Sequence, residues 1–145
     1  MYRQRVVENA ALFAQVEQAV AEGHSVTITV RGVSMRPLLR DLKDKVVLER
    51  ADRLRVGDIA LFLYGDRHLL HRIRRIVGEQ ITMQGDALLQ TTEECTREQV
   101  IATVSKIIYP SGRVVSIDSA IYKLKYAIWL SLPKIIKRVV LRLLK

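Results

Sequence analysis

Apolar residues recur at two different periods along the chain. Over Glu8–Glu22 they are spaced three and four positions apart, which predicts an amphipathic helix that covers the core. Gly23 follows this segment and suits the left-handed conformation that ends many helices. The predicted apolar face consists of Ala11, Leu12, Val16, Ala19 and Val20.

After this helix the period changes to two, which predicts half-buried strands. In Ser25–Arg31, for example, valine and isoleucine alternate with threonine and arginine. Short turn sequences containing glycine, aspartate or proline separate the later segments. The seven predicted strands are Ser25–Arg31, Lys45–Glu49, Ile59–Tyr64, His68–Val77, Gln80–Met83, Gln99–Ile108 and Arg113–Ile117. We therefore expect a mainly β fold, either a curled antiparallel or mixed sheet or a partial barrel.

The C-terminal segment returns to helical spacing and is strongly basic. Pro133 must interrupt this helix because it lacks an N–H group, and Ser131 is a candidate cap for the part that follows. The predicted apolar side consists of Ile121, Leu124, Ile128, Leu132, Ile135, Val139 and Leu143, and the basic side of Lys123, Lys134, Lys137, Arg138, Arg142 and Lys145. We expect a β domain with an N-terminal helix over residues 1–117 and an amphipathic basic segment over residues 118–145.

The charge is distributed unevenly. The chain carries a net +9, but residues 113–145 hold eight Lys or Arg and only one acid, Asp118. The preceding body is nearly neutral, which argues against a nucleic-acid-binding core. Of the 145 residues one is cysteine, Cys95, so we expect a free and at least partly buried thiol.

The sequence also bears on location. Glu8 and Glu17 interrupt the N-terminal apolar residues, so we expect no signal peptide. No segment reaches the ~20 apolar residues that a membrane-spanning helix requires. These features predict a cytoplasmic or peripheral membrane protein.

Ser34 is the first candidate for chemistry. It lies in Gly32–Pro37 (GVSMRP), directly after a predicted strand. Glycine permits a close backbone approach and proline fixes the following chain, so the hydroxyl is presented on a rigid loop next to possible oxyanion donors. A serine in a loop is more often an ordinary turn residue, and as a nucleophile it needs an adjacent base.

His71 is the candidate base. Period-two alternation places it on one face with Leu69, Ile73 and Val77, while Arg72 and Arg74 point the other way. A histidine in such a position is often a hydrogen-bonded core residue. Histidine is also suited to general base catalysis near neutral pH.

Four short motifs occur in the order that is typical of type I signal peptidases and their LexA-like relatives. They are Gly32–Pro37, Val56–Ile59 (VGDI), His71–Ile73 (HRI) and Gln84–Ala87 (QGDA). The sequence resembles this superfamily over roughly residues 26–108, and it is most similar to the branch with a histidine base, the archaeal and endoplasmic-reticulum type.

The resemblance implies a serine peptidase without a metal or cofactor. Ser34 falls on the nucleophile, His71 on the general base and Asp86 on an aspartate that supports the active site. The histidine branch usually has a second, later aspartate that orients the base, but residues 88–94 contain none. Asp86 alone, Glu93 or Glu94 remain the candidates for that role.

The resemblance therefore predicts an endopeptidase that cleaves a peptide or leader segment by acyl-enzyme chemistry. The basic segment Ser119–Lys145 suits either an anionic membrane surface or packing on the domain itself. The main alternative is a catalytically degenerate module that binds peptides or membrane partners. A regulator that cleaves itself is a weaker one, because no helix-turn-helix precedes the β segment.

Overall fold

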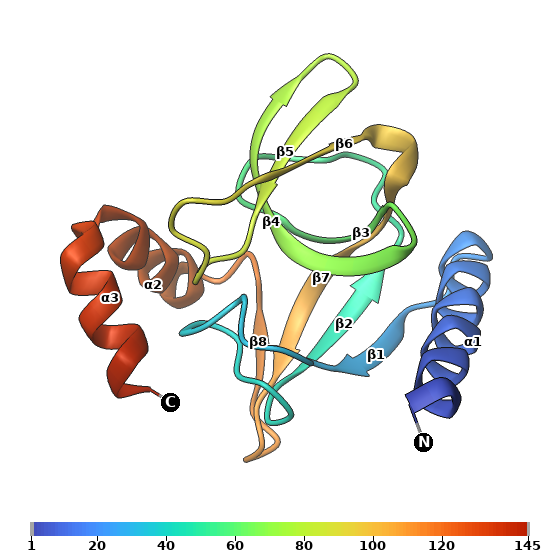
Figure 1. The fold of residues 1–145 in the computed structure, drawn as a ribbon, viewed down its shortest axis with the longest axis horizontal. Coiled ribbons are helices and arrows are strands. Elements are labelled where there is room, and N and C mark those ends of the chain that lie inside the picture. Colours follow the sequence, from blue (N-terminus) through green and yellow to red (C-terminus); the bar gives the residue numbers. More distant parts are fainter. Residues whose placement is uncertain (1, 145) are drawn as a thin grey trace.

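A computed structural model describes the backbone of residues 2–144 and the side chains from residue 11 onward; Met1 and Lys145, which belong to the two expected parts of the chain, lie outside the described residues. Eight strands and three α-helices make up the fold, so the expected mainly β architecture with helices at both ends is confirmed (Figure 1). The strands are β1 (Val26–Thr29), β2 (Lys45–Glu49), β3 (Ile59–Tyr64), β4 (Arg67–Val77), β5 (Gln80–Gln84), β6 (Glu93–Thr96), β7 (Val100–Ile108) and β8 (Val114–Ser116). The helices are α1 (Tyr2–Ala21), α2 (Ala120–Ser131) and α3 (Lys134–Leu143), and a short 3-10 turn, Arg97–Gln99, precedes β7.

The strands form one antiparallel sheet that curls without closing. Its order is β1-β2-β7-β3-β4-β5-β6, with β8 paired to β7. Every paired neighbour is antiparallel, so the sheet is not mixed. Although β3 and β6 stand three places apart in this order, they contact each other, which shows how strongly this half of the sheet curls.

Two differences from the predicted strands matter for the site. The short, polar strand β6 was not predicted, and it adds an eighth strand at the edge of the sheet. In β4 the register shifts between Ile73 and Arg75, and a bulge of this kind reverses the alternation of side chains beyond it. Val77, which was predicted on the same face as His71, is therefore exposed.

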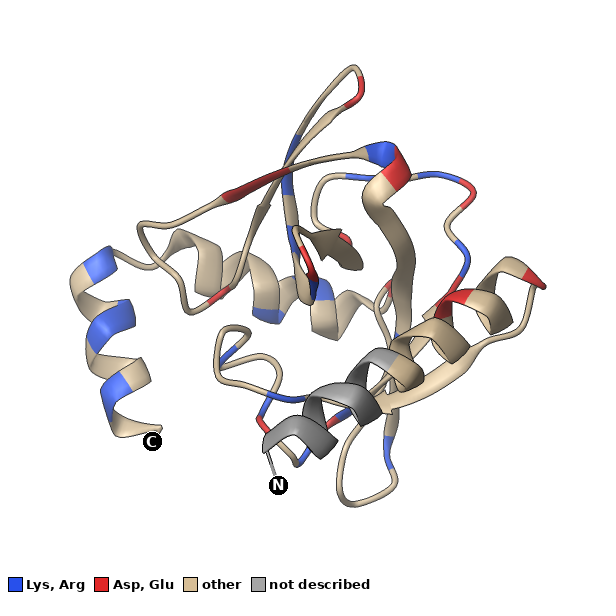
Figure 2. Ribbon diagram, turned by 45° about the vertical axis from the view of Figure 1, so that its right-hand side comes forward, with Lys and Arg blue, Asp and Glu red and all other residues tan. Residues whose placement is uncertain are grey.

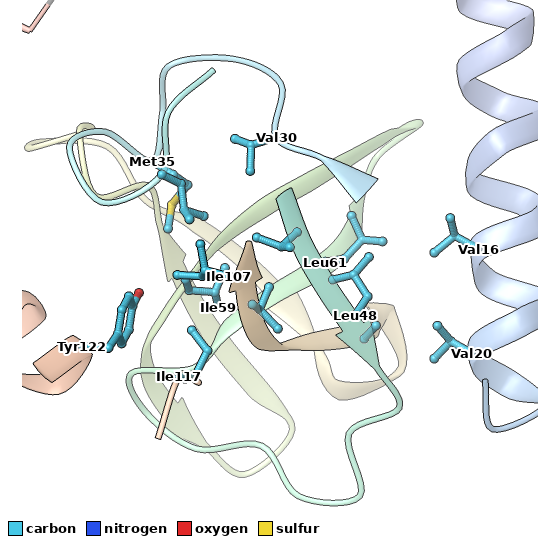
Figure 3. Packing of buried hydrophobic residues seen from close by; sticks show 14 residues of the cluster. Val16, Val20, Val30, Met35, Leu48, Ile59, Leu61, Ile107, Ile117 and Tyr122 are labelled. Atoms are coloured by element: carbon cyan, nitrogen blue, oxygen red, sulfur yellow. The ribbon is translucent and has the colours of Figure 1, made fainter. Parts of the chain in front are cut away.

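The main core lies between the sheet and α1. Val16 and Val20 of α1 pack with residues of β2, β3 and β7, as Figure 3 shows for Leu48 and Leu61. The helix ends as predicted: Gly23 has a φ of +87°, and its N–H donates to the carbonyl of Val20 at 3.0 Å.

The basic segment is divided into two helices at Pro133, as expected. Ser119 caps α2 by accepting a hydrogen bond from the N–H of Tyr122 at 3.2 Å. The predicted cap at Ser131 is wrong, because its hydroxyl donates to the carbonyl of Ile128 and so completes the end of α2. Among the described residues, no helix has the length and apolar character needed to cross a bilayer.

Candidate active site

Ser34 lies on a loop between β1 and β2 whose two ends are joined. The N–H of Val30 donates to the carbonyl of Asp44 at 2.9 Å, and the N–H of Leu42 donates to the carbonyl of Val30 at 2.8 Å. Met35 and Leu39 anchor the middle of the loop in the core. The loop is therefore fixed on both sides of a half-buried serine.

A buried carboxylate strengthens the same loop. Asp44 is fully buried and accepts hydrogen bonds from both the backbone and the side chain of Arg40. The hydrogen bond that the Arg40 side chain donates to Asp44 raises the pKa of Arg40 above its ordinary value, although desolvation opposes this effect. On the N-terminal side of the same loop, the N–H of Gly32 donates to the carboxylate of Asp41 at 2.8 Å.

The QGDA segment meets the serine directly. The carbonyl of Ser34 accepts a hydrogen bond from the N–H of Ala87 at 2.8 Å. Gly85 lies so close that a Cβ at this position would be 2.6 Å from the same carbonyl oxygen. Two motifs separated by about fifty residues in sequence therefore form a single backbone junction at the serine.

His71 reaches this junction from β4. Its Nε2 atom lies 3.1 Å from the Oγ atom of Ser34, within hydrogen-bonding distance. The histidine is only 4% exposed, and the ring of Phe62 lies beside it with a centroid separation of 6.0 Å. The structure thus brings together the two residues that the sequence proposed as nucleophile and base.

The other ring nitrogen of His71 contacts Glu93. A short hydrogen bond joins His71 Nδ1 to Glu93 Oε1, and both side chains are largely shielded from water. Glu93 belongs to β6, which the curl of the sheet carries back over β3. The neighbouring carboxylate, Glu94, accepts instead from the hydroxyl of Thr82. Of the three candidates for orienting His71, Glu93 is the one in contact with it.

Asp86 has a different partner. Its carboxylate accepts two hydrogen bonds from Arg72, at 2.8 and 2.6 Å, in an ion pair whose side chains are 3% and 0% exposed. Asp86 is therefore adjacent to the serine junction in sequence, but it is paired with the residue after His71 and not with His71 itself.

The burial of Arg72 was missed in the sequence analysis. Its guanidinium also donates to the hydroxyl of Tyr122 at 2.9 Å and lies 3.9 Å from the centroid of the Tyr126 ring. Burial alone would lower the pKa of Arg72, but the hydrogen bonds and charge of Asp86 outweigh it and raise that pKa. Trp129 completes the cluster by donating to the carbonyl of Asp86 at 3.0 Å. The aromatic face of α2 thus covers the opposite face of the strand that carries the histidine.

A groove lies along a gap in the sheet, and its lining reaches Arg31, at the start of the loop that carries Ser34. Its volume is about 410 Å³, and β1, the start of the Ser34 loop, β3, β4 and α1 all contribute to its lining. In the described part of the chain, β1 pairs only with β2, and Arg67–His71 of β4 pair only with β3. Its apolar lining includes Leu12, Phe13, Ile28, Val30, Leu61 and Leu70.

The remaining candidate groups lie outside this arrangement. Cys95 is buried and free, as expected, and burial together with the charges of Glu94 and Glu93 raises the pKa of its thiol to about 11. His68 contacts Glu17 at 2.9 Å and stacks on Phe13. Among the side chains of residues 11–144, no three from His, Cys, Asp or Glu cluster as metal ligands would.

Comparison with known proteins gives no assignment. No model of a known protein family matches the chain, and a search of curated proteins finds no significant relative. Inferences about function therefore depend on the geometry of the site.

Proposed function

We propose that this protein is a serine endopeptidase that uses a Ser34–His71–Glu93 triad. The observation that carries the proposal is the contact of both ring nitrogens of His71, one with the Ser34 hydroxyl and the other with the Glu93 carboxylate. A hydroxyl, an imidazole and a carboxylate in this order are the recurring arrangement for nucleophilic serine catalysis.

Each residue has a distinct role in the proposed reaction. His71 Nε2 takes the proton of Ser34 while Oγ attacks the carbonyl carbon of the peptide bond. Glu93 accepts the hydrogen bond of Nδ1–H and stabilises the positively charged imidazolium that forms. The imidazolium then protonates the departing amine, which leaves an ester on Ser34. A water molecule, deprotonated by His71, hydrolyses this ester and restores the hydroxyl.

The developing oxyanion needs preorganised donors. Within the described residues the backbone N–H of Ser34 donates no hydrogen bond, whereas its carbonyl is held by Ala87. This N–H is our candidate for the oxyanion hole. Because the loop is fixed at both ends, the donor does not have to be ordered when the substrate binds.

Asp86 supports the site indirectly in this proposal. Its side chain neutralises Arg72, and its backbone lies between Gly85 and Ala87, which position Ser34. Glu93 takes the orienting role that the later aspartate has in the histidine branch of the signal-peptidase superfamily. The degenerate-module alternative was motivated by the lack of such a carboxylate, and the contact of Glu93 with His71 supports the peptidase proposal over it.

The groove between β1 and β4, whose lining includes Arg31 of the Ser34 loop, suits an extended peptide. A chain lying between β1 and the first half of β4 can hydrogen-bond to either strand edge, a common mode of peptide recognition. The apolar lining then favours small or aliphatic side chains in the substrate near the scissile bond.

The test is covalent labelling followed by cleavage profiling. We expect a fluorophosphonate probe to modify Ser34, identified by mass spectrometry of proteolytic fragments, and a mixed peptide library to be cut. Ser34→Ala and His71→Ala should abolish both, while His24→Ala, which changes an exposed histidine, should not. Absence of any Ser34 adduct and of any cleavage by the folded wild-type protein would refute the proposal.

A further inference from the structure

Helix α2 has two apolar faces that point in opposite directions. Its aromatic face is buried on the body, with Tyr122 and Trp129 only 3% and 5% exposed. Three aliphatic residues share the opposite face through spacings of three and four and are more than half exposed. They are Ile121, Leu124 and Ile128.

Helix α3 turns a large part of its apolar surface away from the body. A helix that packs on its own domain normally turns its apolar stripe toward the core. In α3 the partly covered side chains are those of Lys137, Val140 and Leu141, so the covered side is of mixed character. The aliphatic stripe at four-residue spacing points away from the body: Ile135, Val139 and Leu143 are 71%, 53% and 78% exposed.

The charge of this region has one sign. Lys134, Arg138 and Arg142 each directly precede a residue of the exposed stripe of α3 in the sequence. Residues 119–144 contain no acid, and the coloured charges on α2 and α3 are all basic (Figure 2). None of the salt bridges among the described residues involves a cation of α3. Burial lowers the pKa of Lys137, the charges of Arg74 and Lys134 lower it further, and the charge of Asp86 opposes them.

We propose that α3, together with the exposed aliphatic face of α2, docks on an anionic lipid bilayer. Aliphatic side chains enter the boundary of the acyl chains, and the adjacent Lys and Arg contact the acidic headgroups, as in interfacial helices. A second copy of the chain fits this surface less well, because a two-fold contact through α3 would bring two rows of cations together.

The docking surface is connected to the active site. Residues 87–91 line one groove with Arg138, Leu141 and Arg142 of α3, and the same segment holds Ser34 through the N–H of Ala87. Docking of α3 would therefore present the Ser34 loop close to the headgroups. Lipid binding itself does not require the proposed peptidase activity.

Flotation of the full chain with vesicles tests the proposal. We expect binding to phosphatidylcholine vesicles that contain phosphatidylglycerol and little binding to phosphatidylcholine alone. The triple variant Ile135→Ser, Val139→Ser, Leu143→Ser should weaken binding at least about tenfold, because it removes most of the apolar stripe. The triple variant Lys134→Gln, Arg138→Gln, Arg142→Gln should weaken it about a hundredfold.

Matched controls change the same residue types elsewhere. Val77→Ser with Val114→Ser removes two exposed valines of the sheet, and Lys43→Gln, Arg53→Gln, Lys106→Gln removes three exposed cations of the body. Both controls should bind like the wild type, as should Ser34→Ala, so this test is independent of the peptidase test. All of these positions are exposed except Ser34, and circular dichroism checks that each variant is folded.

Three results would overturn the proposal. The first is a wild-type protein that does not float with anionic vesicles, and the second is an equal loss of binding in the controls. The third is a wild-type dimer in analytical ultracentrifugation that the α3 stripe variant converts to monomer, because a second copy would then cover the surface.

Discussion

Gly85 and Ser34 touch through their backbones: a Cβ on Gly85 would lie 2.6 Å from the carbonyl oxygen of Ser34. Real Cβ atoms do not approach a backbone oxygen so closely, so the requirement for glycine here is one of space. The glycine of the QGDA motif therefore determines where the nucleophile stands.

Gly85→Ala should displace the Ser34 loop and slow catalysis. We expect the rate of fluorophosphonate labelling to fall roughly 10²-fold, since a shift of about 1 Å in a reacting group has this effect. Gly112→Ala is the control for general backbone strain, because Gly112 has a φ of +88°, which disfavours alanine, while the space around its Cβ position is open. If Gly85→Ala labels at the wild-type rate, the junction does not position the serine.

Glu93→Gln tests whether the carboxylate on Nδ1 of His71 is part of the machinery. Glutamine keeps the size of the side chain but cannot stabilise an imidazolium by charge, so we expect kcat to fall by between roughly 10²- and 10⁴-fold with little change in KM. Glu94→Gln, on the adjacent residue, should keep near wild-type kcat because Glu94 binds Thr82. Partial recovery in Glu93→Asp would support an orienting role, whereas equal effects of Glu93→Gln and Glu94→Gln would contradict it.

Much of this arrangement could be predicted from sequence because it depends on local patterns. Alternation of apolar residues located seven of the strands, and the order of short motifs brought Ser34 and His71 into one hypothesis. Strand β6 was missed because its sequence, EECT, has one apolar residue among polar ones. The one residue that indicates a strand here is Cys95, which is buried between exposed or half-exposed neighbours.

The rest depends on contacts between distant segments. Arg72 was predicted to point away from the core, and it does lie on the face opposite His71. That face is buried only because α2, fifty residues later, covers it with Tyr122 and Tyr126. The same is true of the bulge in β4 and of the contact that His71 makes with Glu93 and not with Glu94. Both follow from the curl of the sheet, which periodicity along one segment does not encode.

The buried pair of Arg72 and Asp86 should dominate the stability of the helix–sheet junction. Arg72→Met leaves an unpaired buried carboxylate, and we expect the free energy of unfolding to fall by about 3–5 kcal/mol. Arg75→Met, at an exposed position of the same strand, should change it by less than about 0.5 kcal/mol.

Urea unfolding of the single variants and of Arg72→Met with Asp86→Leu measures the coupling. The double variant should recover much of the loss, because neither charge is then left unpaired. Additive losses would mean that the two side chains are not energetically coupled in the folded protein.

Cys95 gives a prediction about pH. Burial, with the charges of Glu94 and Glu93, raises its pKa to about 11, so the thiol of the folded protein stays neutral at pH 9, whereas an exposed thiol is largely ionised there. We expect iodoacetamide to modify folded protein at pH 9 at least about a hundredfold more slowly than protein in urea, because the thiolate is the reactive form.

The stability of the folded protein should also change with pH in a defined direction. Well below about pH 8.5 the thiol is neutral in both states. Between about pH 8.5 and 11 the unfolded chain loses the proton that the folded chain retains, so the free energy of unfolding falls as pH rises. Cys95→Ala should remove this part of the pH dependence, and rapid alkylation of the folded wild type would show that the thiol is accessible and ionised.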